Sequence, residues 1–170
     1  GLPWSRRMNP ALKTDAARTR RTAMVLGFAH LAGLTVPLAA FLSGVGPRVG
    51  PGVSWAAVLV MAASLCLQRW AQHSLGTCFT LALQCGERQP VCNEGPYRWV
   101  RHPAYSAQIL FWGALGLASG SITAAALVGA VAVPAYAYRL GEEERMLVSA
   151  LGSRYAAYTK ETRRLIPFLW

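Results

Sequence analysis

The sequence predicts an all-α, polytopic membrane protein with about four transmembrane helices and a polar site at one end of them. Two observations carry this prediction. The 170-residue chain is 54% hydrophobic and only 14% charged, against about 25% charged for a typical soluble domain. Its Lys and Arg residues also gather in three segments that four membrane crossings would bring to one face. By hydropathy, the remaining alternative is a soluble helical bundle with an apolar core.

Apolar stretches define the helices in order along the chain. A helix needs roughly 20 apolar residues to cross a hydrocarbon core about 30 Å thick. The first two stretches are continuous and each suits one helix. The third, Pro103–Tyr138, holds no Asp, Glu, Lys or Arg; it is too long for one crossing, and the sequence Ser119-Gly120-Ser121 allows it to fold back. We therefore expect membrane helices at residues 23–43, 53–72, 103–119 and 122–140.

The placement of positive charge orients these helices. Six Lys or Arg residues precede the first helix, four lie around the connection between the second and third, and six follow the fourth; of all 17, only Arg48 falls on the other side. The positive-inside rule makes the shared face cytoplasmic. We therefore expect both chain ends and the connection 73–102 on the cytoplasmic side. A net charge of +10 could attract nucleic acid, but a chain with four membrane helices is not expected to bind it.

We interpret residues 1–170 as a single membrane-embedded domain. Residues 1–22 are too polar to span a membrane, and we expect them to form a helix on its surface. Residues 141–170 read as a helical tail that Gly152 breaks in two. The two outer connections are short, so the site is expected on the inner side. The Arg-rich, Ala-rich composition favours a GC-rich genome, and hence the cytoplasmic membrane of a bacterium.

Cysteine spacing gives no support to a metal site. The four cysteines form no C-x-x-C pair, and no histidine stands at zinc-finger spacing from them. On the reducing face of the membrane, disulfides are rare. We expect free thiols and no metal. The four are Cys66, Cys78, Cys85 and Cys92.

Charged groups stand at two predicted helix ends. Arg101 and His102 precede Pro103, and Pro suits the first turn of a helix. The positive end of that helix would favour a negative or electron-rich ligand. Arg139 and Glu143 follow the fourth helix and are four residues apart. Plain alternatives remain open, since cations commonly flank membrane helices and a pair at this spacing can be a simple ion pair.

The segments GPYRWVRHPAY, EEERML, LGSRYAAY and LIPF resemble the isoprenylcysteine carboxyl methyltransferase family. The wider family includes phospholipid methyltransferases and many small bacterial membrane methyltransferases. The resemblance runs from about Leu75 to Phe168. It implies a pocket for S-adenosylmethionine, built from the connection 73–102 and the start of the C-terminal helices.

The resemblance also implies roles for particular residues. Arg139 matches an arginine that positions the substrate, and Glu143 a carboxylate that faces the cofactor. One departure concerns the linker, where Val91-Cys92-Asn93-Glu94 replaces the frequent Leu-Val-Thr of the family. The cofactor-binding positions implied are Gln84, Gln89, Pro90, Val91, Cys92, Tyr97, His102, Pro103, Ala104, Tyr105 and Glu143.

The favoured reaction is O-methylation of a carboxylate on a lipidated or hydrophobic substrate. A carboxylate is already ionised at pH 7, and Arg139 offers it a planar, two-pronged partner. N-methylation of a phospholipid headgroup is an alternative, in which the amine would first have to lose a proton. Thiol methylation and a non-enzymatic scaffold whose basic face binds anionic membrane lipids also remain open.

Overall fold

The computed structural model describes residues 10–44, 46–76 and 93–166, and the side chains of residues 18–166 within these ranges. The described residues are helical apart from short connections and two isolated bridges, so the all-α prediction is confirmed. The elements are α1 (Pro10–Ser43), α2 (Pro51–Leu75), the 3₁₀ helix η3 (Gly95–Arg98), α3 (Pro103–Ala118), α4 (Ile122–Leu151) and α5 (Ser153–Glu161).

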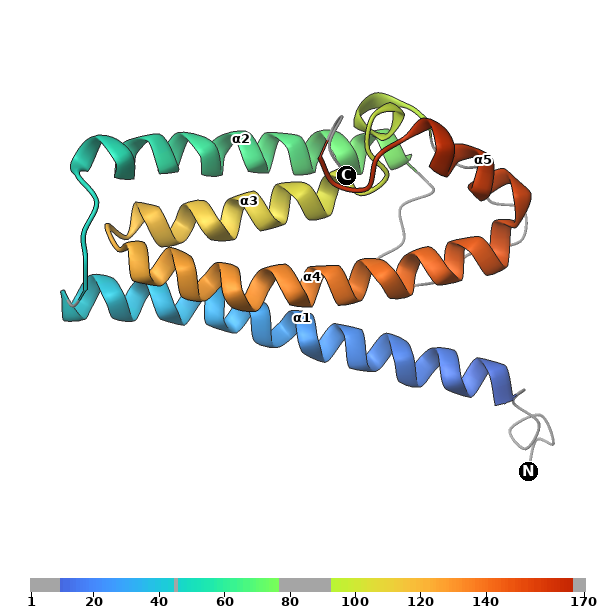
Figure 1. The fold of residues 1–170 in the computed structure, drawn as a ribbon, viewed down its shortest axis with the longest axis horizontal. Helices are drawn as coiled ribbons and strands as arrows, with labels where there is room; N and C mark the ends of the chain where they lie inside the picture. Colours follow the sequence, from blue (N-terminus) through green and yellow to red (C-terminus); the bar gives the residue numbers. More distant parts are fainter. Residues whose placement is uncertain (1–9, 45, 77–92, 167–170) are drawn as a thin grey trace.

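The four long helices lie side by side in the order α2, α3, α4, α1 (Figure 1). Their outward faces carry large apolar side chains, including Phe28, Trp55 and Leu59, which are exposed in the isolated chain. The residues that α2 buries are instead small: Ala57, Ser64 and Ala71. Small residues between helices and large apolar residues outside are typical of a bundle that packs in lipid.

Glycines allow two close approaches between the helices. A Cβ on Gly116 of α3 would overlap the backbone of Ala125 in α4, and a Cβ on Gly33 of α1 would overlap the ring of Trp112. Trp112 belongs to the buried cluster with Val128, Ala132 and Tyr136, so the contact at Gly33 lies in the core of the bundle.

Three helical segments are long and apolar enough to cross a membrane: Arg18–Ser43, Pro51–Leu75 and Ile122–Leu151. α3 has 16 residues, which gives a length of about 24 Å, less than the hydrocarbon thickness. The prediction of four crossings therefore stays a prediction, whereas four apolar helices in one bundle are observed.

Two predicted helix boundaries were wrong. The first helix begins at Pro10, not near residue 23, so residues 10–22 continue α1 and form no separate helix. The fourth continues through Gly141 to Leu151, because a single glycine costs a helix only about 1 kcal/mol and the next turn buries Glu142 and Glu144. The predicted break at Gly152 is confirmed; this residue adopts φ +54° between α4 and α5.

Backbone hydrogen bonds tie the helix ends together at both ends of the bundle. At the end that carries the connection between α1 and α2, called the outer end after the predicted orientation, Val49 N–H donates to the Gly120 carbonyl at 2.9 Å and Ile122 N–H to the Pro47 carbonyl at 3.2 Å; the opposite end is called the inner end. At the inner end, the chain after α5 returns to the start of α3. There Arg101 N–H donates to the Arg163 carbonyl at 2.7 Å.

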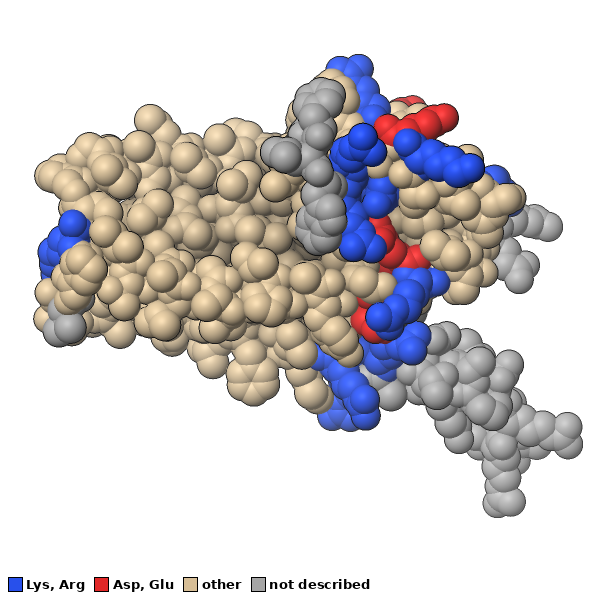
Figure 2. Space-filling model, in the orientation of Figure 1, with Lys and Arg blue, Asp and Glu red and all other residues tan. Residues whose placement is uncertain are grey.

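Charged side chains gather at the inner end, around the start of α3 and the last turns of α4 (Figure 2). Arg48 lies in the outer connection, where its backbone forms an isolated antiparallel β-bridge with Ser121. The separation of charge predicted from the sequence is therefore present in the described part of the chain. Its assignment to the cytoplasmic side stays a prediction.

Candidate active site

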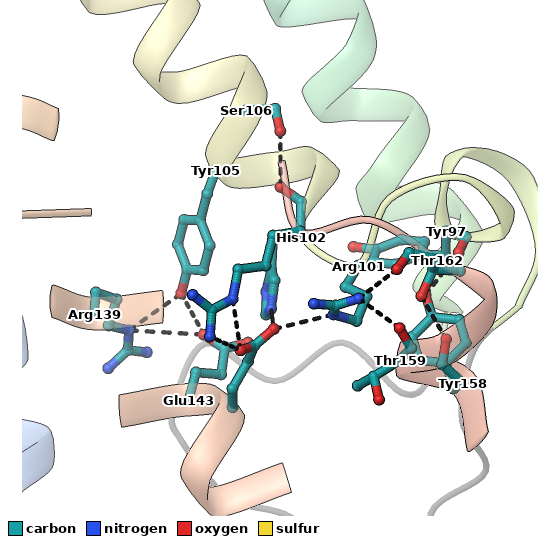
Figure 3. A network of polar contacts seen from close by, with 12 residues as sticks. Tyr97, Arg101, His102, Tyr105, Ser106, Arg139, Glu143, Tyr158, Thr159 and Thr162 are labelled. Atoms are coloured by element: carbon teal, nitrogen blue, oxygen red, sulfur yellow. Dashed lines mark hydrogen bonds and ion pairs between the residues drawn. The ribbon is translucent and has the colours of Figure 1, made fainter. Parts of the chain in front are cut away.

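The candidate site lies where the first turn of α3 meets the part of α4 beyond its apolar stretch (Figure 3). α3 begins at Pro103 with His102 as its N-cap residue, as the sequence predicts. Arg139 and Glu143 are four residues apart on α4 and so lie on one face of it. Tyr105 reaches both from α3.

The Tyr105 hydroxyl joins the two charged groups. It donates to Glu143 Oε2 at 2.5 Å and accepts a hydrogen bond from Arg139 Nε at 3.1 Å. Arg139 Nε lies 3.9 Å from Glu143 Oε2, too far for a direct hydrogen bond. The simple ion pair foreseen as an alternative is therefore present, but with a phenol between its two charges.

Arg139 and Glu143 differ in their exposure to solvent. Arg139 is 8% exposed, and its NH1 donates to Thr22 Oγ1 of α1 at 2.8 Å. The Glu143 side chain is 27% exposed. Glu143 can therefore still meet a ligand, whereas one edge of the Arg139 guanidinium is held by the protein.

Glu144, the next residue, holds three segments together. Its Oε1 accepts a hydrogen bond from Arg101 Nε at 3.0 Å, and its Oε2 accepts one from Arg164 Nε at 2.8 Å. His102 Nε2 lies 3.4 Å from Glu144 Oε1. Arg101 also donates through NH1 to the Thr162 carbonyl at 2.5 Å. This carboxylate thereby fastens the chain after α5 to the start of α3.

The other motif residues lie around these contacts. His102 is 5% exposed, and its ring stacks on Tyr105 with centroids 5.8 Å apart. Pro103 is fully buried, and Ala104 is half-buried in the same turn. Tyr97 is buried in η3, where its carbonyl accepts a hydrogen bond from the Tyr158 hydroxyl at 2.6 Å.

The remaining predicted positions lie outside the described residues: Gln84, Gln89, Pro90, Val91 and Cys92. Of the four cysteines only Cys66 is described, as an exposed free thiol. Within the described ranges, no group of three or more His, Cys, Asp or Glu residues could hold a metal ion.

The residues present suit a ligand with ammonium and hydroxyl groups. Glu143 offers a partly open carboxylate. The Tyr155 hydroxyl is buried and has no hydrogen-bond partner among the described residues. Burial first, and then the nearby Glu144 carboxylate, raise the pKa of the Tyr155 phenol, so it stays protonated. S-adenosylmethionine, with its amino-acid tail and ribose, has groups of this kind.

Sequence reasoning missed three residues of the site: Thr22, Glu144 and Arg164. Three consecutive glutamates follow Gly141, and nothing local tells which of them the tail contacts. A threonine after two arginines at the start of an apolar stretch carries no signal of its own. Only the packing of α1 on α4 brings it to Arg139.

Comparisons with known proteins agree with this architecture. The family model described as isoprenylcysteine carboxyl methyltransferase (ICMT) matches residues 55–149, more than half of the chain. The fold is similar to that of the eukaryotic intramembrane Ras methyltransferase ICMT, in a structure without a monobody, with a TM-score of 0.68 and 19% sequence identity. That match covers 85% of this chain and 52% of the eukaryotic one, so the chain spans about half of its length.

No curated protein sequence matches the chain. The match of the family model over more than half of the sequence nevertheless agrees with the apolar bundle, the polar inner end and the R-H-P-x-Y turn that begins α3. The chain therefore belongs to the isoprenylcysteine carboxyl methyltransferase family of membrane methyltransferases.

Proposed function

We propose that the protein is an S-adenosylmethionine-dependent methyltransferase that O-methylates a carboxylate on a lipidated or hydrophobic substrate. The arrangement of Arg139, Tyr105 and Glu143 carries this proposal. It combines a buried, held guanidinium with a partly open carboxylate, at the point where charged residues meet apolar helices. The similar eukaryotic protein is described as an intramembrane Ras methyltransferase, which is consistent with such a substrate.

Residues at the inner end of α3 and α4 would hold the cofactor. S-adenosylmethionine would supply a methyl group on a sulfonium sulfur, which a nucleophilic oxygen or nitrogen can accept. Glu143 would bind its ammonium group by a charge-assisted hydrogen bond. The ring of Tyr105 would lie near the sulfonium, and the Tyr155 hydroxyl would gain a partner. The resemblance implies that residues 84 and 89–92, which lie outside the described residues, would also bind the cofactor.

Arg139 keeps N–H donors that can bind the carboxylate of a methyl acceptor. Its Nε donates to Tyr105 and its NH1 to Thr22, while its NH2 has no hydrogen-bond partner in the described part of the chain. A carboxylate acceptor is ionised at neutral pH, so no residue needs to remove a proton from it. The role of Arg139 is then to bind and orient this carboxylate, and positioning of this kind supplies much of the rate in group transfer.

Replacement of Arg139 tests the proposal. Losing a buried charged contact with a ligand costs on the order of 2–5 kcal/mol. Arg139→Ala should lower turnover by at least about tenfold and change cofactor affinity little, while Arg139→Lys should restore only part of the rate because an ammonium lacks the two-pronged geometry.

Arg154→Ala, on the exposed face of α5, is the matched control and should keep wild-type turnover. Turnover on the identified acceptor and calorimetry with the cofactor are the two measurements. Unchanged or faster turnover in Arg139→Ala would contradict a carboxylate acceptor and favour the amine of a phospholipid headgroup, since a nearby cation repels that group.

A further inference from the structure

The inner part of α1 contacts the site through a threonine that belongs to none of the sequence motifs. Thr22 is fully buried and precedes Arg139 by 117 residues. Its hydroxyl donates to the Thr19 carbonyl at 2.9 Å and accepts from Arg139 NH1 at 2.8 Å. A hydroxyl has one proton to donate. Because that proton goes to Thr19, a lone pair of Oγ1 faces the guanidinium.

A second contact fixes the same two helices one turn away. Arg18 Nε lies 2.7 Å from Glu142 Oε2, and the Glu142 side chain is only 5% exposed. Arg18 and Thr22 are four residues apart on α1, and Arg139 and Glu142 are three apart on α4, so each pair shares one helix face. We call these four residues the α1 clamp. They set the position of α1 against the site-bearing turn of α4.

Glu143 competes with Thr22 as a partner of the Arg139 guanidinium, and this competition shows what the Thr22 hydrogen bond does. Glu143 Oε2 lies 3.9 Å from Arg139 Nε, with the Tyr105 hydroxyl bonded to both, and loss of the Thr22 contact would let the guanidinium shift closer to this carboxylate. A guanidinium in direct contact with Glu143 would have its charge neutralised by this carboxylate. It would then be less able to bind the carboxylate of a methyl acceptor. The bond to Thr22 holds NH1 on the α1 side and opposes this shift.

We propose that Thr22 is a positioning residue that keeps the guanidinium of Arg139 available to the methyl acceptor by opposing its closer approach to Glu143. The α1 clamp thereby makes α1 part of the acceptor site, although α1 precedes the residues that the family model matches. This inference rests on the proposed function of Arg139, and its test separates the two.

Two substitutions at Thr22 can separate the effect of its hydroxyl group on activity from the effect of its side-chain packing. Thr22→Val keeps the branched shape and removes the hydroxyl, whereas Thr22→Ser keeps the hydroxyl. Thr35 is the matched control because it lies on the same helix, donates to the Leu31 carbonyl at 2.8 Å and is exposed. Thr35→Val therefore removes an equivalent helix contact far from Arg139.

The experiment measures kcat/KM for a carboxylate acceptor and the affinity for S-adenosylhomocysteine. Thr22→Val should lower kcat/KM about tenfold, the size expected for a lost hydrogen bond to a charged group. Cofactor affinity should stay within about twofold, and Thr22→Ser and Thr35→Val should stay within about twofold of wild-type kcat/KM, changes equivalent to well under 1 kcal/mol.

A double-mutant cycle excludes a merely structural role. In an Arg139→Ala background, Thr22→Val should cause no further loss, because the residue through which it acts is gone. Three outcomes would each overturn the inference and leave the proposed function standing. They are wild-type kcat/KM in Thr22→Val, a loss in Thr22→Ser as large as in Thr22→Val, and an equal further loss from Thr22→Val in the Arg139→Ala background. Absence of methyl transfer to a carboxylate by the wild-type protein would overturn the proposed function, and the inference with it.

Discussion

Glu144 joins α4 to the start of α3 and to the chain after α5. It accepts from Arg101 and Arg164, and its side chain is only 12% exposed. Removing one partner of a buried charge pair costs about 3–5 kcal/mol, because the other charge stays buried without compensation. We expect Glu144→Gln to lower the free energy of unfolding by this amount.

Thermal unfolding in detergent measures the effect, with Glu161→Gln at the exposed end of α5 as control. The control should keep the wild-type melting temperature. Equal melting temperatures for the two variants would mean that Glu144 does not fasten the tail to α3.

Two tyrosines of α5 should respond in opposite ways to loss of their hydroxyls. Tyr158 donates to the buried Tyr97 carbonyl at 2.6 Å, so Tyr158→Phe should destabilise the protein by about 1–3 kcal/mol. The Tyr155 hydroxyl has no partner among the described residues, so Tyr155→Phe should leave the ligand-free protein as stable as wild type or more so.

The same pair of variants tests the cofactor pocket. Thermal unfolding with and without S-adenosylhomocysteine should show a smaller ligand-induced shift in Tyr155→Phe than in wild type, because a bound ligand would partner that hydroxyl. A clear loss of ligand-free stability in Tyr155→Phe would show that the hydroxyl already has a partner in the protein.

At this scale, the sequence predicts residues that share a motif and misses those that meet only through folding. Tyr105 and Glu143 could be named because they belong to the local patterns R-H-P-x-Y and E-E-E-x-x-L, and Arg139 because it follows the predicted fourth helix and matches an arginine of the family. The fold brings all three together. Their individual roles stay predictions. Thr22 and Arg164 could not be named, since their contacts depend on how α1 and the chain after α5 pack against α4.

At the scale of the helices, the contact between α3 and α4 depends on one glycine. A Cβ on Gly116 would overlap the backbone of Ala125, which cannot move as a flexible side chain can. Gly116→Ala should therefore push the helices apart and cost about 1–3 kcal/mol.

Gly113, one turn earlier on α3, is the matched control because nothing lies within 4 Å of its Cβ position. Gly113→Ala should be neutral or stabilising, as alanine favours a helix. A melting temperature of Gly116→Ala equal to that of Gly113→Ala would contradict the close packing of α3 on α4.

The existence of the four helices was predictable here, but the start of α1 and the end of α4 were not. Apolar stretches of sufficient length placed all four long helices, because burial or lipid contact decides where such residues go. The ends depended on contacts that the sequence does not display. α4 runs through Gly141 because the turn after it buries Glu142 and Glu144, and the start of α1 extends through a polar segment in which Arg18 and Thr22 reach α4.

At the scale of the whole molecule, composition and charge asymmetry were sufficient to predict an all-α membrane protein with its polar residues at one end. The orientation of that end remains to be tested. Arg48→Cys lies in the outer connection and Arg154→Cys on α5, and both positions are exposed. In a background without the four native cysteines, an impermeant maleimide applied to intact cells should label only Arg48→Cys. Labelling of Arg154→Cys alone would reverse the proposed orientation.

The most direct measurement concerns the chemistry itself. Purified protein is incubated with S-adenosylmethionine that carries a labelled methyl group and with a membrane extract, and the labelled lipid-soluble product is treated with alkali. A methyl ester hydrolyses and releases its label as methanol, whereas a methyl group on nitrogen or on a thioether sulfur stays bound. The account predicts a labelled product that releases methanol, and its loss in Arg139→Ala. A label that survives alkali, or no transfer by the wild-type protein, would contradict it.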